Sequence, residues 1–297
     1  MRVLVTGGAG FIGSHLVDAL VDRGDDVVVL DNFKRGRRDH LARHVDAGAI
    51  TLVTGDIRDE QPLASSIEGV ELVYHLAAQS NVMGAVQDMD YSFTTNVLGT
   101  YNVLKAAATS GVRRLVFSSS REVYGDPDDI PVREDAPLAA KNPYGASKLA
   151  GEAYCRVWQA ATGIDCMVLR FANVYGPRDR DRVIPIWLRR AGEGGDLEVY
   201  GGRQVLDFIW VGHVVDALLA AATCRNDGAV NVGSGEGVPI LDLGKRILEL
   251  THGASQLRIL PARSVEVVRF VAHTGRMRSV LGIEPPSDPL AALALTN

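Results

Sequence analysis

A strand that runs directly into closely spaced glycines opens the chain and limits what it can fold into. The apolar run Val3-Leu4-Val5 leads to Gly7, Gly10 and Gly13, where a helix-forming stretch begins. Glycines at this spacing let the backbone turn tightly and approach a ligand. The helix N-terminus behind them presents free N–H groups to an anion. Strand, glycine loop and helix together predict the first unit of a dinucleotide-binding domain.

Strand-length apolar runs alternate with helical stretches over the first 170 residues. The predicted strands are residues 2–5, 27–30, 50–53, 72–76, 115–117 and 167–169. The predicted helices between them are residues 13–22, 61–67, 91–110 and 144–162. Runs that are apolar throughout are typical of strands buried on both faces, and the alternation favours right-handed crossovers. We therefore expect an α/β fold with a doubly wound parallel sheet.

Beyond about residue 170 this alternation loosens, and glycine and proline become frequent. Helices are expected near residues 184–192 and 211–224, between short strands. The pattern predicts a smaller, mixed C-terminal substrate lobe. We place the dinucleotide-binding domain at residues 1–170 and the lobe at residues 171–297, with a soft boundary because no Ser/Gly-rich linker separates them.

Composition and charge exclude several classes of function. The net charge of −5 argues against bulk affinity for nucleic acid or anionic membrane. No apolar run reaches the roughly 18 residues of a membrane span, and the opening strand leaves no room for a signal peptide, so we expect a cytoplasmic protein. Cys155, Cys166 and Cys224 are widely separated. They indicate reduced core thiols rather than a disulfide framework or a metal site.

A carboxylate follows the second predicted strand. Asp31 lies 18 residues after Gly13, where it would hydrogen-bond the adenosine ribose and repel a 2′-phosphate. NAD is therefore favoured over NADP, although Arg35 and Arg37 lie close by in the sequence. The other expected cofactor contacts are Gly7, Gly10, Phe11, Ile12, Asn32, Asp56, Ile57, Leu76, Ala77, Ala78, Gln79, Asn96 and Ser118. For Asp56 a helix cap, and for Asn96 capping or interior hydrogen bonding, remain alternatives.

Tyr144 and Lys148 are four residues apart, and Ser118-Ser119-Ser120 lies upstream. Residues four apart share one face of a helix, so the ammonium can lie near the phenol and lower its pKa. Such a tyrosine can take a proton from a hydroxyl group. With the glycine loop, the pair predicts an enzyme that oxidises a hydroxyl with a nicotinamide cofactor.

Four motifs occur together and in order. They are Thr6-Gly7-Gly8-Ala9-Gly10-Phe11-Ile12-Gly13, Ser118-Ser119-Ser120-x-x-Val123-Tyr124-Gly125, Tyr144-x-x-x-Lys148 and Arg170-Phe171-Ala172-Asn173-Val174-Tyr175-Gly176-Pro177. From Met1 to about Leu281 the chain resembles the extended short-chain dehydrogenase/reductases, in their NAD-dependent nucleotide-sugar epimerase/dehydratase branch. The resemblance implies a Rossmann-type fold, bound NAD, a UDP-sugar substrate and a homodimer formed through the helices at 91–110 and 144–162.

The resemblance also implies roles for single residues. Ser120 would hydrogen-bond the sugar hydroxyl, Tyr144 would remove its proton, and Lys148 would bind the nicotinamide ribose. The resemblance implies Ser120, Asn173, Arg263 and Glu266 as substrate contacts. From their charge or their place in the predicted pocket we add Ser80, Arg121, Arg182 and Arg203. Relatives usually carry a phosphate-binding arginine where this chain has Leu206, and Arg203 could supply the missing charge.

Residues 120–122 bear on the outcome of the reaction. The resemblance implies that hydride leaves C4 of the sugar and gives a 4-keto intermediate. In the dehydratases of this family the segment resembles Thr-Asp-Glu, whereas this chain has Ser120-Arg121-Glu122. It therefore lacks the acid that assists loss of water. Glu122 recurs in UDP-glucuronate decarboxylases, so it stays among the candidate catalytic residues.

We therefore expect NAD-dependent epimerisation at C4 of a UDP-sugar. The substrate would be UDP-glucose or UDP-galactose. It would be UDP-glucuronate or UDP-galacturonate if Arg121 or an arginine of residues 178–182 pairs with a substrate carboxylate. The alternatives are a nucleotide-sugar dehydratase, a UDP-glucuronate decarboxylase that uses Glu122, and a catalytically silent NAD-binding regulator.

Overall fold

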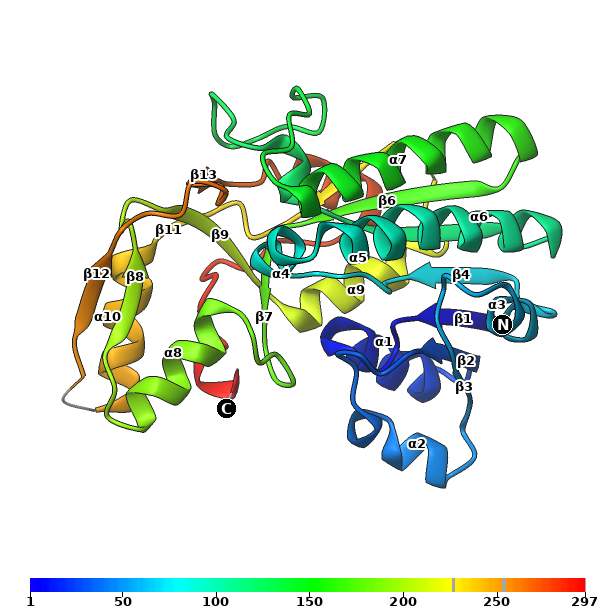
Figure 1. Ribbon diagram of the computed structural model, residues 1–297, viewed down its shortest axis with the longest axis horizontal. Helices are drawn as coiled ribbons and strands as arrows, with labels where there is room; N and C mark the ends of the chain where they lie inside the picture. Colours follow the sequence, from blue (N-terminus) through cyan, green and yellow to red (C-terminus); the bar gives the residue numbers. More distant parts are fainter. Residues whose placement is uncertain (226–227, 253–254, 297) are drawn as a thin grey trace.

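A seven-stranded parallel sheet forms the centre of the larger part of the molecule (Figure 1). The computed structural model describes residues 1–225, 228–252 and 255–296. In spatial order the strands are β10 (Val230–Val232), β6 (Asp165–Phe171), β5 (Arg114–Ser120), β4 (Leu72–His75), β1 (Arg2–Thr6), β2 (Asp26–Asp31) and β3 (Ile50–Thr54). The expected doubly wound parallel sheet is confirmed, and its strand order reverses between β1 and β4.

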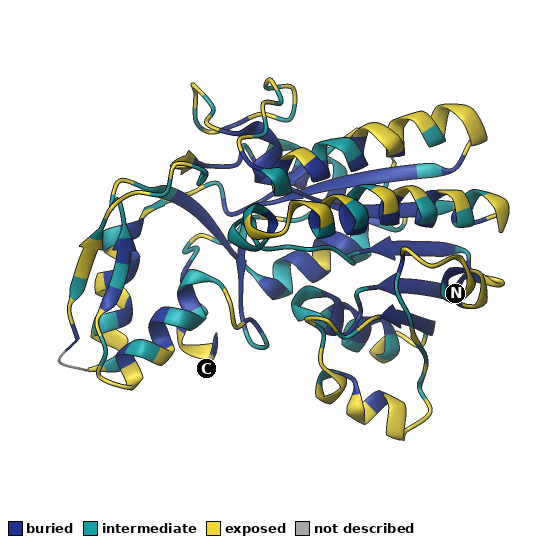
Figure 2. Ribbon diagram, in the orientation of Figure 1, coloured by how far each residue is buried: buried dark blue, intermediate teal, exposed yellow. Residues whose placement is uncertain are grey.

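Helices cover both faces of this sheet because its strands are apolar on both sides. Val3 and Val5 belong to the core beneath α1 (Phe11–Asp22) and α9 (Val211–Ala221). Leu4, between them in the sequence, belongs to the opposite core beneath α3 (Glu60–Ile67) and α6 (Gly99–Thr109). Figure 2 shows these strands buried between the helix layers. Side chains that alternate between two cores explain why the runs carry no polar face.

The predicted helix at residues 91–110 is not regular. It consists of α5 (Met89–Phe93), the π-helix η2 (Thr94–Leu98) and α6. Asn96 lies in the π-helical turn and is buried. Its side chain accepts a hydrogen bond from the Gln79 amide (2.7 Å) and donates to the Gln79 carbonyl (3.0 Å) and to Ser147 Oγ (2.9 Å). Asn96 therefore holds the loop after β4 against the helix that carries Tyr144.

The smaller lobe contains two further sheets and its own core. Strand β9 (Val205–Trp210) pairs in parallel with β7 (Asn173–Tyr175) and β13 (Arg269–Phe270) and antiparallel with β11 (Gly237–Pro239). Strands β8 (Leu197–Tyr200) and β12 (Leu257–Leu260) pair beside α8 (Val183–Gly192) and α10 (Ile240–Thr251). The expected mixed lobe is confirmed. The boundary at residue 170 stays a prediction, because α9 and β10 return to the large sheet.

The remaining elements are short, apart from one long helix beside β5. That helix is α7 (Pro143–Thr162). The others are η1 (Arg38–His40), α2 (Ala42–Asp46), α4 (Val82–Gln87), η3 (Arg121–Tyr124), α11 (Gly275–Leu281) and η4 (Leu293–Thr296).

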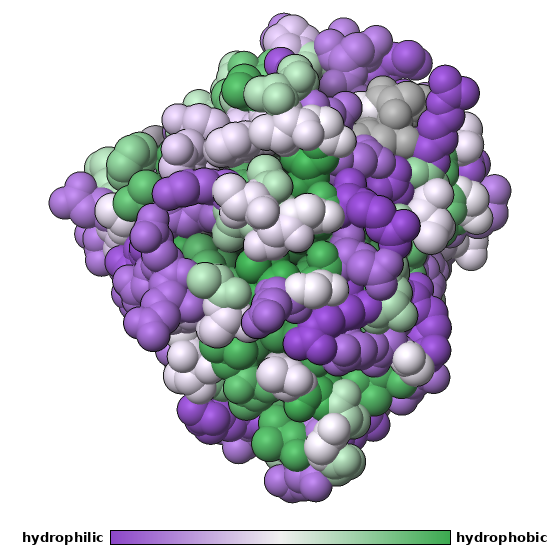
Figure 3. All heavy atoms as spheres, turned by 90° about the vertical axis from the view of Figure 1, so that its right-hand side faces the viewer, coloured by the Kyte–Doolittle hydropathy of each residue, from purple (hydrophilic) through white to green (hydrophobic). Residues whose placement is uncertain are grey.

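No helix of the described residues is long and apolar enough to cross a membrane. Within the same residues, no group of three or more His, Cys, Asp or Glu side chains could hold a metal ion. On the side that carries the amino ends of the central strands, apolar residues lie among polar ones (Figure 3).

A buried ion pair joins α7 to the strands beneath it. Arg170 of β6 donates to both oxygens of Glu152 on α7, at 2.9 and 2.7 Å, and both side chains are buried. Ser119 of β5 donates to the same carboxylate. Arg170 also donates to the hydroxyl of Tyr124 (2.8 Å) and to the carbonyl of Glu134 (3.0 Å). The paired groups therefore fix the position of α7 relative to β5 and β6.

Replacing Arg170 by Met should destabilise the fold by about 3–5 kcal/mol, because Glu152 would remain buried without its cation. The double variant Glu152→Met with Arg170→Met should cost less than the sum of the two single changes. Urea unfolding measures each free energy. The control is Lys245→Ala, which breaks an exposed pair with Asp242 and should change stability by about 0.5 kcal/mol or less. If the loss of unfolding free energy in the double variant equalled the sum of the losses in the two single variants, the pair would not be coupled.

Candidate active site

The glycine loop forms a cradle that side chains would fill. Gly7 has a φ of 73°, and a Cβ there would lie 2.7 Å from the Ala77 nitrogen. A Cβ on Gly13 would lie 2.2 Å from the Gly7 carbonyl oxygen. Helix α1 begins at Phe11 without a side-chain cap from any described residue. Its first N–H groups can therefore bind the diphosphate of a dinucleotide.

One cavity of about 890 Å³ extends from this cradle, past the carboxyl ends of the central strands, into the smaller lobe. Most of the predicted site residues line it. They are Gly7, Gly10, Phe11, Ile12, Asp31, Asn32, Ile57, Leu76, Ala77, Ala78, Gln79, Ser80, Ser118, Ser120, Arg121, Glu122, Tyr144, Lys148, Asn173, Arg182, Arg263 and Glu266. Its volume suits a cofactor together with a substrate.

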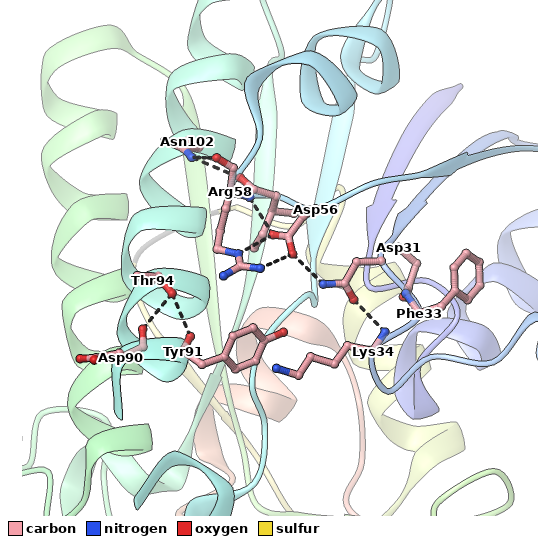
Figure 4. A network of polar contacts seen from close by, with 11 residues as sticks. Asp31, Phe33, Lys34, Asp56, Arg58, Asp90, Tyr91, Thr94 and Asn102 are labelled. Atoms are coloured by element: carbon pink, nitrogen blue, oxygen red, sulfur yellow. Dashed lines mark hydrogen bonds and ion pairs between the residues drawn. The ribbon is translucent and has the colours of Figure 1, made fainter. Parts of the chain in front are cut away.

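Three predicted site residues, all within the described part of the chain, do not line this cavity. Asp56 instead accepts hydrogen bonds from Asn32 (2.8 Å) and Arg58 (Figure 4). Although burial opposes the shift, bonds from Arg58 and Asn32 lower the pKa of Asp56 to about 2. Asn96 makes the interior hydrogen bonds described above. Arg203 is exposed, so this structure does not place its charge toward a substrate phosphate.

Asp31 lies at the end of β2, where its carboxylate is anchored by the backbone. Its oxygens accept hydrogen bonds from the amides of Ala9 (3.0 Å) and Phe33 (2.8 Å). Burial raises the pKa of Asp31, and the two amides oppose that rise. The anchored carboxylate is available at the cavity wall as an acceptor for ribose hydroxyl groups.

Tyr144 lies in the first turn of α7 because the sequence before it starts the helix there. Asn142 caps the helix by accepting a hydrogen bond from the Gly145 amide (2.8 Å), and Pro143 occupies the first position. The Tyr144 phenol lies beside the side chain of Ser120, the last residue of β5, whose hydroxyl lowers the pKa of the phenol. The structure therefore brings these two predicted residues together.

Lys148 lies one turn after Tyr144 and is buried. Its Nζ donates to the Ser118 carbonyl (2.8 Å) and lies 6.0 Å from the centre of the Tyr144 ring. Burial lowers the pKa of Lys148 to about 8. The ammonium therefore occupies the cavity wall beside the phenol, anchored on β5.

The pKa of Tyr144 is raised in this structure, chiefly by burial. Among nearby charges, Arg182 lowers it most and Glu122 raises it. The prediction that Lys148 brings this pKa below its ordinary value is therefore wrong for this structure. The charge that lowers this pKa most belongs to Arg182 of the smaller lobe, which sequence spacing along α7 could not reveal.

Arg121 and Glu122 form a buried ion pair beside Tyr144. Arg121 Nη2 lies 2.9 Å from one oxygen of Glu122 and 3.3 Å from Asn173 Oδ1. Asn142 donates to the other oxygen of Glu122 (2.7 Å). Arg121 Nη1 is buried and has no partner among the described residues. The pair is neutral as a whole, yet one donor remains available to a ligand.

The far end of the cavity lies in the smaller lobe. Arg263 is 3.5 Å from the centre of the Tyr200 ring and 2.9 Å from Glu266. Tyr200, Lys34 and Tyr91 also line the cavity, but we did not predict them as site residues. Tyr200 ends a four-residue strand whose weak periodicity gave no signal. Lys34 belongs to a basic cluster that sequence alone could not orient.

Comparison with known proteins identifies the family. A family-wide sequence model described as the NAD dependent epimerase/dehydratase family matches residues 3–233. The UDP-glucose 4-epimerase of Mycolicibacterium smegmatis is 36% identical over 96% of this chain and 94% of its own length. The chain belongs to the NAD-dependent epimerase/dehydratase family.

Solved structures of family members extend the comparison. The UDP-glucose 4-epimerase of Thermotoga maritima, solved with UDP-glucose, is 33% identical and has a TM-score of 0.94, covering 100% of this chain and 97% of that one. A dTDP-glucose 4,6-dehydratase from Streptomyces venezuelae, solved with NAD, is 32% identical with a TM-score of 0.95, covering 100% and 95%.

Family membership and the epimerase relatives make this chain an NAD-dependent epimerase that acts on a nucleotide-sugar. The glycine cradle and the anchored Asp31 carboxylate fit the dinucleotide. The alternative of a catalytically silent regulator is not supported, because the curated relatives are enzymes and Tyr144, Lys148 and Ser120 stand together in the cavity.

Replacing Arg182 by Gln should move the acidic limb of the pH–activity profile to higher pH. Arg182 favours the charged phenolate and lowers the pKa of Tyr144. Without that charge the pKa rises, so the basic form is populated only at higher pH. Arg182→Lys keeps the charge and should leave the limb near its wild-type position. The measurement is kcat/KM against pH, and an unmoved limb in Arg182→Gln would contradict this role.

Proposed function

We propose that this family member interconverts UDP-sugars that differ in configuration at C4, through a 4-keto intermediate. The observation that carries the proposal is the adjacent pair of Ser120 and Tyr144, with Lys148 beside it, in the same cavity as the glycine cradle. Ser120 orients the C4 hydroxyl, and Tyr144 takes its proton. NAD, when bound, accepts the hydride from C4 and later returns it.

Epimerisation requires the keto sugar to turn before the hydride returns to its opposite face. Tyr144 then gives the proton back to the C4 oxygen, so the reaction is neutral in electrons and protons. Small side chains line the sugar region of the cavity, among them Ala77, Ala78, Ser80 and Ala172. They leave room for the turning sugar while the nucleotide stays bound.

The nucleotide end supplies the anchor that this turning requires. Arg263 lies against Tyr200 and pairs with Glu266, which offers a cation for phosphate and a carboxylate for ribose hydroxyl groups. Asn173 donates to the Asp207 carbonyl (2.9 Å), and this bond fixes β7 against β9. Leu206 lines the same region. The phosphate contact therefore falls to other cavity arginines.

The contacts of Glu122 support epimerisation over elimination or decarboxylation. Both of its oxygens accept hydrogen bonds, one from Arg121 and one from Asn142. Both oxygens are therefore engaged within the protein, and neither is directed to a substrate as the acid that assists loss of water. Arg121 occupies the position at which the dehydratases described above carry an acidic residue. A catalytic role for Glu122 stays a prediction, and positioning Arg121 is the role that its contacts support.

We favour a UDP-hexose over a UDP-hexuronate. Two of the loop cations are already balanced, since Arg178 pairs with Asp18 (2.7 Å) and Arg182 pairs with Asp179 (3.0 Å). Arg121 is balanced by Glu122. The second candidate, UDP-glucuronate or UDP-galacturonate, is favoured by one observation, the buried and unpartnered Nη1 of Arg121. Arginine can bind a carboxylate through two donors.

We also infer a homodimer formed through α6 and α7. These helices lie side by side (Figure 1) and expose large apolar side chains. Leu98, Tyr101, Tyr154 and Val157 are 44%, 37%, 39% and 60% exposed. The Tyr101 and Tyr154 rings, 5.8 Å apart, connect the two helices into one apolar surface. A second copy would bury this surface against its own equivalent.

Incubation with UDP-glucose should give a product of unchanged mass, separable as UDP-galactose. A loss of about 18 Da would indicate dehydration, and a loss of about 44 Da from UDP-glucuronate would indicate decarboxylation. Tyr144→Phe should lower kcat about 100-fold or more. The matched control is Tyr154→Phe on the exposed side of the same helix, which should keep wild-type turnover. Activity retained by Tyr144→Phe would remove the proposed base.

The same assay, run on UDP-glucuronate, decides between the sugar classes. The balanced charges predict a higher kcat/KM for UDP-glucose. If UDP-glucuronate were preferred, and Arg121→Met abolished that preference, the second candidate would replace the first.

Val157→Glu should convert the dimer to a monomer, because a carboxylate would be buried at the proposed interface. Light scattering after gel filtration measures the molecular mass. Val45→Glu is the control, since Val45 is also an exposed apolar residue (42%) but lies on α2. A monomeric wild-type protein, or a dimeric Val157→Glu variant, would contradict the interface.

A further inference from the structure

Arg35 spans the cavity and joins three segments that are far apart in the sequence. It lies in the segment after β2, and its Nη1 donates to Ser80 Oγ (3.2 Å) in the loop after β4. Its Nη2 donates to Asp181 (2.7 Å), which lies between β7 and α8. All three residues line the cavity. One guanidinium therefore connects the cofactor half of the cleft to the smaller lobe.

These contacts place Arg35 near the glycine cradle. Asp181 is followed by Arg182, whose guanidinium lies 5.3 Å from the ring of Phe11, the first residue of α1. The same loop is held on α1 by His15, which bonds the Pro177 carbonyl (3.0 Å). A diphosphate at the N-terminus of α1 would have backbone N–H groups on one side and Arg35 across the groove.

The segment that carries Arg35 is held in place by its neighbours. The Lys34 amide donates to Asn32 Oδ1 (3.0 Å), and Lys34 Nζ lies 3.1 Å from the centre of the Tyr91 ring (Figure 4). Asp31 accepts a hydrogen bond from the Phe33 amide. Arg35 therefore extends from an anchored turn rather than from a loose loop.

The partner that Arg35 has in this structure is easily exchanged. Arg35 and Asp181 are 36% and 58% exposed, and ion pairs with that much solvent contribute little. A diphosphate offers more charge and several acceptor oxygens, which arginine can bind through two donors at once. The guanidinium therefore binds such a ligand more strongly than it binds Asp181.

We propose that Arg35 is a cofactor-retaining residue, which leaves Asp181 and closes over the diphosphate of bound NAD. Asp181 holds the guanidinium at the groove until the cofactor is present. This role goes beyond the proposed sugar reaction, because it concerns the residence of NAD and needs no sugar.

The test follows NAD on the purified protein in the absence of any sugar. After gel filtration the bound NAD is released by heat and counted per chain. Its loss on dilution into NAD-free buffer is then timed. Arg35→Ala should lose NAD about tenfold faster than wild type, the effect of one charged hydrogen bond. Arg35→Lys, which keeps the charge but not the fork, should lie between them.

Two further variants test whether the effect belongs to Arg35 itself, rather than to Asp181 or to the positive charge of the segment. Asp181→Asn removes the resting partner and should retain NAD as well as wild type or better, because Arg35 is then free for the diphosphate. The control Arg37→Ala removes a charge from the same segment, where Arg37 pairs with Asp39 (2.9 Å), and should leave retention unchanged. The proposal is overturned if Arg35→Ala retains NAD like wild type. It is also overturned if either Asp181→Asn or Arg37→Ala loses NAD as fast as Arg35→Ala.

Discussion

The carboxylate of Glu152 is the contact on which the geometry of the site depends. It receives Arg170 from β6 and Ser119 from β5, while its own helix carries Tyr144 and Lys148. On either side of Ser119, the Ser118 carbonyl accepts a hydrogen bond from Lys148, and Ser120 lies beside Tyr144. One buried group therefore sets the distance between the residues of the helix and the residues of the strand. Small shifts at this point would separate Tyr144 from the Ser120 hydroxyl.

The buried charges around this contact are close to balance. The cluster consists of the cations Arg121, Lys148 and Arg170 and the anions Glu122 and Glu152, all buried. Among the charges that act most on the phenol, Glu122 of this cluster raises the pKa of Tyr144, as burial does. The cations that lower it most, Arg182 and Arg35, lie outside the cluster. The proposed base therefore depends on charges from the surrounding loops to lose its proton.

Much of this arrangement could be predicted from the sequence because it is local. The glycine spacing, the capped start of α7 at Asn142 and Pro143, and the wholly apolar strands each depend on a few neighbouring residues. The π-helical turn at Asn96 was not predictable, because it depends on contacts with Gln79 and Ser147 that form only in the folded chain. The same holds for Asp56, which Arg58 and Asn32 hold away from the cavity, and for Arg203, which points to solvent.

The pKa of Tyr144 shows the limit of this local reasoning most clearly. Spacing on a helix identified Lys148 as a neighbour, but it could not report how deeply the phenol is buried. It also could not show that Arg182, from another lobe, contributes the charge that lowers this pKa most. The direction of a pKa shift depends on everything that surrounds a group, and most of that is distant in sequence.

The return of the chain to β10 has a consequence for how the molecule is assembled. Residues 230–232 complete the edge of the large sheet by pairing with β6 in parallel, and α9 packs against α1. Until those residues have been synthesised, β6 presents an unpaired edge, the kind of surface on which other chains can add. The first 170 residues by themselves would leave this edge of the sheet open. The smaller lobe therefore contributes to the stability of the larger part of the molecule as well as to the cavity.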